Sequence, residues 1–160
     1  MSPEEARIKE VRTIADYQFG KGCGKALFPD GVSFKLSRTG RIRQILHSKN
    51  RLATSRAKDG FFTLSLQGAA ALHKVLPFNK FRVVVCAEAV PFVAKGKTAF
   101  AKHVLELDPA LRAGDEVLLT DEHDTLLATG QLLFSPAEVQ ALESGPAVDV
   151  RVGINSKKQA

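Results

Sequence analysis

Residues 82–135 read RVVVCAEAVPFVAKGKTAFAKHVLELDPALRAGDEVLLTDEHDTLLATGQLLFS, a series of short apolar runs separated by turn residues. The run at 82–87 is almost wholly apolar, which predicts a buried strand. Further strands are predicted at 99–107, 116–120 and 126–134, and a short helix at 89–94. Short strands at this spacing, with so little helix between them, predict a small closed β-barrel.

The pattern continues into one more helix and one more strand. Ser135, Pro136 and Glu138 supply the cap, the first helical position and the acidic third position of a helix that should run to about Glu143. Residues 147–152 form the last predicted strand. The polar residues 155–160 are expected to be a flexible tail.

Before residue 82 the pattern changes to helices and hairpins. Ser2 and Pro3 predict the start of a helix that stops near Phe19, where several glycines follow. Strands are predicted at 32–36, 41–46, 52–55 and 61–64, and a helix at 66–76 with Ala69, Leu72, Val75 and Leu76 inward. A small antiparallel sheet with flanking helices is an α+β unit, so we assign the chain to the α+β class.

The glycine-rich stretch Gly20–Gly24 allows two interpretations. It looks superficially like a phosphate loop, but it lacks the spacing of a Walker A sequence and ends in Lys-Ala, without a hydroxyl for magnesium. We predict a turn, and a phosphate-binding role stays open as the alternative.

Length and composition bound the class of protein. The 160 residues are 44% hydrophobic and 25% charged, which suits one ordinary domain or two small ones. We place the boundary within 77–81 and predict domains at 1–78 and 79–154. No apolar run is long enough to span a bilayer, and the charged N-terminus lacks the apolar core of a signal peptide. Two cysteines are too few for a disulfide framework, so we expect a cytoplasmic protein.

Positive charge is concentrated in the first half. Residues 1–80 carry 15 basic and 6 acidic residues, whereas residues 81–160 carry 8 and 11. Residues 31–58 contain eight cations and no acid. Such a stretch is either a solvated basic face or a surface for a large anion, of which nucleic acid is the commonest. Arg41 and Arg43 are separated by one residue, so on a strand they project from the same face.

No motif in the sequence predicts catalysis, a metal or a cofactor. The four histidines show no metal-ligand spacing with the cysteines. The ligand-rich run Asp121–Asp124 lies between two predicted strands and is more simply a solvated turn. We therefore expect a protein with no enzyme activity of its own.

The second half resembles the PUA domain, a compact pseudo-barrel found on RNA-modifying enzymes. The resemblance is carried by the apolar first strand, by Lys95-Gly96-Lys97, by the run from Phe100 to Val104, by Arg112-Ala113-Gly114-Asp115-Glu116-Val117 and by Ala128-Thr129-Gly130-Gln131. The first half resembles the domain that precedes PUA in archaeal-type tRNA-guanine transglycosylases, through ADYQFGKG, SRTGRIRQIL and LATSRAKDGFFTLSLQGA. The chain has no room for the (β/α)₈ catalytic barrel of those enzymes, which needs roughly 250 residues.

The PUA resemblance implies an RNA-binding surface around the short helix, the following loop and the last strand. Carried onto this sequence, it implies RNA contacts from Lys95, Gly96, Lys97, Thr98, Lys102, His103 and Arg151. Without the resemblance, Lys-Gly-Lys-Thr would be read as a turn with exposed lysines. Arg41 and Arg43 are a second candidate surface, because the planar guanidinium suits phosphate. The aromatic residues Tyr17, Phe19 and Phe28 could stack on bases, although core packing is the simpler expectation for the phenylalanines.

These observations predict a non-catalytic RNA-binding protein whose partner is a structured RNA such as tRNA, and which acts in tRNA modification. The alternative is a protein-interaction subunit that completes a split transglycosylase and has little RNA affinity alone. A third hypothesis is a relative that binds another RNA or a small anionic ligand.

Overall fold

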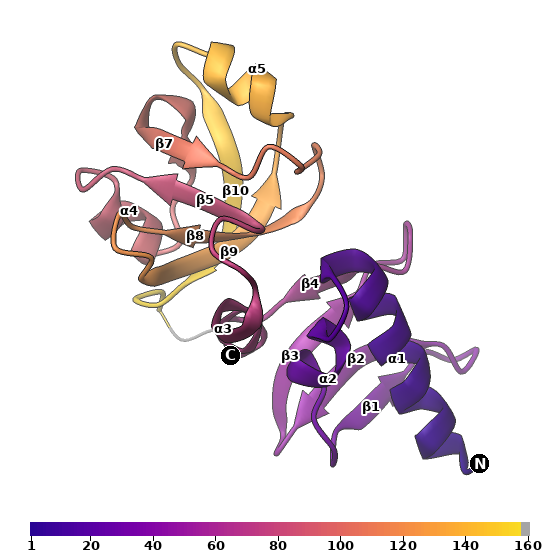
Figure 1. Ribbon diagram of the computed structural model, residues 1–160. Helices are drawn as coiled ribbons and strands as arrows, with labels where there is room; N and C mark the ends of the chain where they lie inside the picture. The colour runs from indigo at the N-terminus through magenta and orange to yellow at the C-terminus, as the bar shows by residue number, and fades with distance from the viewer. Residues whose placement is uncertain (158–160) are drawn as a thin grey trace. The chain divides into compact units, whose positions relative to one another are not determined.

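The computed structural model describes residues 1–157 and separates the chain into two compact units, Met1–Leu76 (unit 1) and Pro77–Ala160 (unit 2). Both units are drawn in Figure 1. The division falls two residues before the boundary that we predicted between residues 78 and 79. Within the described range, no helix is long and apolar enough to cross a membrane. Residues 158–160 of the predicted tail lie outside that range.

Unit 1 is a four-stranded antiparallel sheet with three helices, as the α+β prediction requires. The helices are α1 (Pro3–Phe19), α2 (Cys23–Leu27) and α3 (Leu66–Val75). The strands are β1 (Ser33–Leu36), β2 (Ile42–His47), β3 (Asn50–Ser55) and β4 (Phe62–Leu64), paired in chain order. Figure 1 shows α1 and α2 lying against one face of this sheet.

Local caps begin two of these helices where the sequence places them. The Ser2 hydroxyl accepts the backbone N–H of Glu5 at 3.1 Å, and Ser65 accepts that of Gly68 at 3.1 Å. Gly24, which we expected to lie in a turn, is instead within α2. A side chain there is excluded because a Cβ would lie 2.2 Å from the carbonyl oxygen of Arg12, so α1 and α2 pack at backbone contact.

The core of unit 1 joins the helices to the sheet. Phe28 and Phe62 are buried and meet edge to face, with ring centroids 5.2 Å apart. The side-chain amide of Gln18 donates to the Phe62 carbonyl at 3.0 Å and accepts the Phe62 N–H at 2.8 Å, which ties the end of α1 to β4. Val75 was predicted to face inward, but its side chain is 51% exposed, because Leu76 takes the buried position after the helix.

Unit 2 is built on one mixed sheet that nearly closes on itself. Its strands are β5 (Arg82–Val85), β6 (Ala99–Phe100), β7 (Val104–Leu107), β8 (Glu116–Thr120), β9 (Leu126–Leu132) and β10 (Pro146–Gly153). The order across the sheet is β6-β10-β9-β8-β5-β7. Among these six strands of the described range, β5 and β8 pair in parallel and the other pairs are antiparallel. Two short helices, α4 (Val90–Ala94) and α5 (Pro136–Ala141), accompany the sheet.

The strand predicted at 99–107 is broken into three pieces. Between β6 and β7 the chain makes one 3₁₀ turn, η1 (Ala101–His103). The break is fixed from outside this segment, because the Ala101 N–H donates to the Gly145 carbonyl at 2.9 Å and the His103 carbonyl accepts the Cys86 N–H at 2.9 Å. Lys102 therefore lies on an exposed turn and not on a strand face.

Candidate nucleic-acid interface

The PUA-type candidates begin at the turn that follows α4. The backbone N–H groups of Gly96 and Lys97 fold back onto α4, donating to the carbonyls of Val93 at 2.9 Å and Phe92 at 3.0 Å. Gly96 has φ of 91°, a conformation that glycine adopts without strain. Lys95 and Lys97 are exposed on either side of it, and Thr98 is half-buried.

Residues that follow β10 hold the turn at Gly96 through hydrogen bonds. The Asn155 N–H donates to the Ala94 carbonyl at 2.7 Å, and the Ser156 hydroxyl accepts the Gly153 N–H at 2.8 Å. A Cβ on Gly96 would lie 2.7 Å from that hydroxyl oxygen. Residues 155 and 156, which we placed in the flexible tail, are thus part of the hydrogen-bonded turn that supports the lysines.

The 3₁₀ turn η1 places Lys102 in solvent and His103 beside a carboxylate. Lys102 is exposed. His103 is half-buried, with its Nε2 4.0 Å from the carboxylate of Glu88. An exposed ammonium can neutralise a phosphate, whereas a histidine with a neighbouring carboxylate is less suited to an anion.

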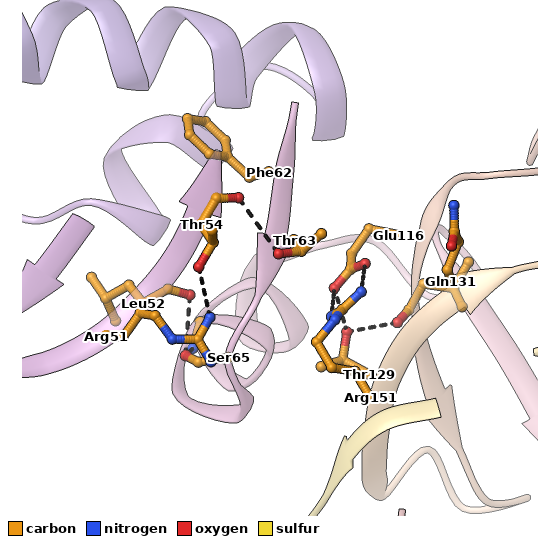
Figure 2. Close-up of polar contacts among 12 residues, drawn as sticks. Arg51, Leu52, Thr54, Phe62, Thr63, Ser65, Glu116, Thr129, Gln131 and Arg151 are labelled. Carbon is orange, nitrogen blue, oxygen red and sulfur yellow. Dashed lines mark hydrogen bonds and ion pairs between the residues drawn. The ribbon is translucent and has the colours of Figure 1, made fainter. Parts of the chain in front are cut away.

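Arg151 has a role inside unit 2. Its guanidinium meets both carboxylate oxygens of Glu116, at 2.5 and 2.7 Å, and Glu116 is 0% exposed (Figure 2). The Thr129 hydroxyl, on the strand between them, lies 3.2 Å from the same carboxylate. Because a buried carboxylate requires such a partner, Arg151 is engaged within the sheet, and an RNA contact from its partly exposed side chain stays a prediction.

Arg41 and Arg43 line a groove of about 960 Å³ in unit 1. One wall is α1, and the other is formed by the turns that join β1 to β2 and β3 to β4, together with the strand residues next to these turns. Five cations line this basic groove against two carboxylates: Arg7, Arg41, Arg43, Arg56 and Lys58, with Glu10 and Asp59. Arg41 precedes β2 and Arg43 lies within it. Both are exposed and line the groove, as does Ile42 between them, so the prediction that the two arginines share one face stays a prediction.

Two of the groove's arginines are held by carboxylates. Arg7 pairs with Glu4 at 3.0 Å, and Arg56 makes a two-pronged pair with Asp59 at 3.1 and 2.7 Å. Burial alone would raise the pKa of Asp59, but the Phe61 N–H, the Arg56 guanidinium and the charge of Lys58 hold that pKa below its ordinary value. Arg41, Arg43 and Lys58 form no ion pair with any residue of the described range, so they remain available to an external anion.

Sequence reasoning missed Arg7 as a member of this surface, whereas Lys58 was already within the acid-free stretch 31–58. Arg7 is on a helix 34 positions before Arg41, and only the docking of α1 on the sheet brings the two together. The available signal was the i, i+3, i+7 spacing of Arg7, Glu10 and Ile14 on one helix face.

Two observations on the described residues concern chemistry other than binding. None of the groups of His, Cys, Asp and Glu within residues 1–157 is arranged to hold a metal ion. Cys23 is buried, and this burial raises the pKa of its thiol. The nearby negative charge of Asp16 raises the pKa further, so the nucleophilic thiolate is disfavoured.

Comparison with known proteins assigns both units. Residues 9–79 match the patch-forming domain C2 of tRNA-guanine transglycosylase, and residues 81–154 match the PUA domain. The tRNA-guanine(15) transglycosylase of Pyrococcus abyssi is 51% identical over 151 residues, which cover 94% of this chain and 26% of the relative. That of Methanothermobacter thermautotrophicus is 44% identical over 147 residues, 91% of this chain and 22% of the relative. The chain thus spans about a quarter of the length of these relatives.

Solved structures agree on the fold. A hypothetical protein from Pyrococcus horikoshii superimposes with a TM-score of 0.72 at 22% identity, covering 98% of this chain and 94% of that one. A conserved PUA domain protein from Thermoplasma acidophilum gives 0.62 at 17% identity, covering 96% and 91%. Both resemblances seen in the sequence are confirmed: the chain carries the patch-forming domain C2 of tRNA-guanine transglycosylase, followed directly by a PUA domain.

Proposed function

We propose that this chain is a non-catalytic RNA-binding protein that recognises structured RNA, specifically tRNA, in connection with tRNA modification. The observation that carries the proposal is the set of exposed lysines on the glycine turn and on η1 of the PUA unit, Lys95, Lys97 and Lys102. Three ammonium groups on backbone that is hydrogen-bonded in place can contact phosphates without first ordering a loop.

The basic groove of unit 1 supplies long-range attraction. Its unpaired cations lie in the half of the chain with the positive net charge, and each phosphate that they neutralise releases counterions. Binding should therefore weaken steeply as salt rises.

Titration of the purified chain with tRNA, at several salt concentrations, tests the proposal. We expect tRNA to bind more tightly than a single-stranded RNA of equal length, because folded RNA presents shape and backbone to both basic surfaces. Equal affinity for the two RNAs would mean that the chain binds RNA through nonspecific charge attraction and does not recognise its fold. Release of guanine from tRNA by the purified chain alone would overturn the non-catalytic assignment.

A second function is favoured by the coverage of the relatives. Because the chain aligns with about a quarter of each tRNA-guanine(15) transglycosylase, it is also suited to complete an enzyme whose remaining part is on another polypeptide. Co-purification with a catalytic subunit that lacks a PUA domain, together with negligible tRNA affinity of the chain alone, would favour this function over the first.

A further inference from the structure

Tyr17 is an exposed aromatic residue in a unit whose other large aromatic rings are buried or half-buried among the described residues. Its side chain is 81% exposed. It stacks on Phe61, with ring centroids 5.9 Å apart and planes inclined by 30°. Phe19 and Phe28, the other aromatic candidates for base stacking, are buried in the core. One face of the tyrosine ring is thus supported by Phe61, and the ring is largely open to solvent.

The Tyr17 ring lies next to the basic groove. On α1 the groove is lined by Arg7, Glu10 and Ile14, and Tyr17 follows Ile14 by three residues on the same face of the helix. On the sheet side, the groove is lined by Gly60 and Phe62, which flank Phe61 in the chain. Tyr17 and Phe61 do not line the groove themselves, but the lining residues nearest to them in the chain place the pair next to the groove, at the end formed by the turn between β3 and β4.

The combination of a cationic groove and an open aromatic ring indicates a particular form of nucleic acid. In a duplex the bases are already stacked on each other and are turned away from the backbone contacts. In an unpaired strand, the phosphates can follow the cations while a base stacks on the ring. The hydroxyls of Ser37, Thr39 and Ser55, which also line the groove, can bond ribose or phosphate oxygens.

We propose that the basic groove of unit 1 binds an unpaired segment of RNA, with its phosphates on Arg41, Arg43 and Lys58 and one base stacked on Tyr17. This inference rests on the proposed RNA-binding function and specifies which part of a folded RNA each unit receives. A loop or an unpaired end enters unit 1, and the lysine turn of unit 2 is left to contact backbone.

The sequence provides a specific probe of this stacking. Tyr17 is the single tyrosine of the chain, and the chain has no tryptophan, so its intrinsic tyrosine fluorescence reports on this ring alone. Titration with a short oligouridylate should quench the emission to a saturating value, because a stacked base quenches the ring. Inorganic polyphosphate of matched charge should bind without quenching, and a blunt-ended RNA duplex should quench less than the oligouridylate.

Variants separate stacking from attraction. Tyr17→Phe keeps an aromatic face and should bind labelled oligouridylate as the wild type does, whereas Tyr17→Ala should lose roughly tenfold in affinity. Phe78→Ala is the matched control, since Phe78 is 71% exposed but lies in an acid-lined hollow of unit 2 with Glu106 and Glu122. It should leave the affinity unchanged.

The outcomes distinguish this inference from the function on which it rests. If the wild type binds tRNA while neither tRNA nor oligouridylate changes the Tyr17 emission, or if Tyr17→Ala binds oligouridylate as tightly as the wild type, the unpaired-segment site is wrong and the RNA-binding function stands. If the wild type binds no tRNA, the proposed function itself fails.

Discussion

Two pairs of cations have different expected effects on RNA binding. Replacing Arg41 and Arg43 with alanine should weaken binding to every RNA and lower the salt slope by roughly one unit for each phosphate that the groove no longer neutralises. Replacing Lys97 and Lys102 should mainly reduce the preference for tRNA over other RNA, because these lysines lie on the fixed turns of the PUA unit. Titrations of both double variants against tRNA and an unrelated RNA, at several salt concentrations, measure the two effects.

Exposed cations contribute little to stability, so both double variants should unfold at the same denaturant concentration as the wild type. If the arginine pair changes neither affinity nor slope while the lysine pair abolishes binding, the groove is a solvated face and unit 2 alone binds RNA.

The ion pair between Arg151 and Glu116 should contribute to the stability of unit 2 and not to its affinity for RNA. Arg151→Ala leaves a fully buried carboxylate without its guanidinium, which should cost about 3 kcal/mol in the free energy of unfolding. Arg112→Ala, at an exposed arginine of the same unit, is the control and should change stability by less than about 0.5 kcal/mol. Denaturant unfolding of both variants tests this. If the Arg151→Ala protein is stable but no longer binds tRNA, Arg151 contacts the RNA and the expected role in stability is wrong.

The carboxylate of Asp59 makes the stability of unit 1 sensitive to acid. Its pKa is lower in the folded chain than in the unfolded chain, so its stabilising effect is present above the unfolded pKa and is lost as pH falls through the folded one. Denaturation by urea should therefore show wild type more stable than Asp59→Asn at neutral pH, and the difference should begin to shrink near roughly pH 4 and disappear at more acidic pH. A difference that stays constant through this acid range would contradict the assignment.

At the scale of elements, α3 and β3 pack at backbone contact. A Cβ on Gly68 would lie 2.2 Å from the Leu52 carbonyl oxygen, which belongs to the strand and cannot turn aside. Gly68→Ala should therefore destabilise unit 1 by about 1–3 kcal/mol despite alanine's higher helix propensity. Thermal unfolding measures this destabilisation. Gln67→Ala, at the exposed neighbouring position of the same helix, should be neutral or slightly stabilising. Equal stability of the two variants would show that helix and strand can separate at no cost.

Elements that are specified by neighbouring residues could be predicted, and those that depend on distant ones could not. Ser2 and Ser135 cap helices through residues three positions away, so the sequence itself predicts where these two helices begin. The break at η1 depends on Gly145, which is more than forty residues from Ala101, and no local pattern marks it. The same limit applies to the sites. The spacing of Arg41 and Arg43 is local, whereas the partner of Arg151 is 35 positions earlier on a different strand.

At the scale of the whole molecule, β10 joins two parts of the sheet of unit 2. It pairs with β9 along most of its length and with β6 at its start. A chain truncated after Gly145 should leave both strands without their neighbour, so unit 2 should become sensitive to protease. Unit 1 has its complete sheet before residue 77 and should stay resistant. Limited proteolysis read by mass spectrometry compares the two, and equal resistance of unit 2 in both chains would mean that β10 is dispensable.

The pairing of β5 with both β7 and β8 also governs how the chain can fold while a ribosome makes it. Synthesis proceeds from the N-terminus at about 5–20 residues per second. Unit 1 is complete once Leu76 has emerged. The valines of β5 come next, yet their parallel neighbour β8 is made some thirty residues later, and the closing strand β10 later still. Until β8 is made, the nascent chain therefore carries unit 1 followed by an apolar strand that lacks its parallel neighbour, and the valines of β5 can be buried only in part by pairing with β7.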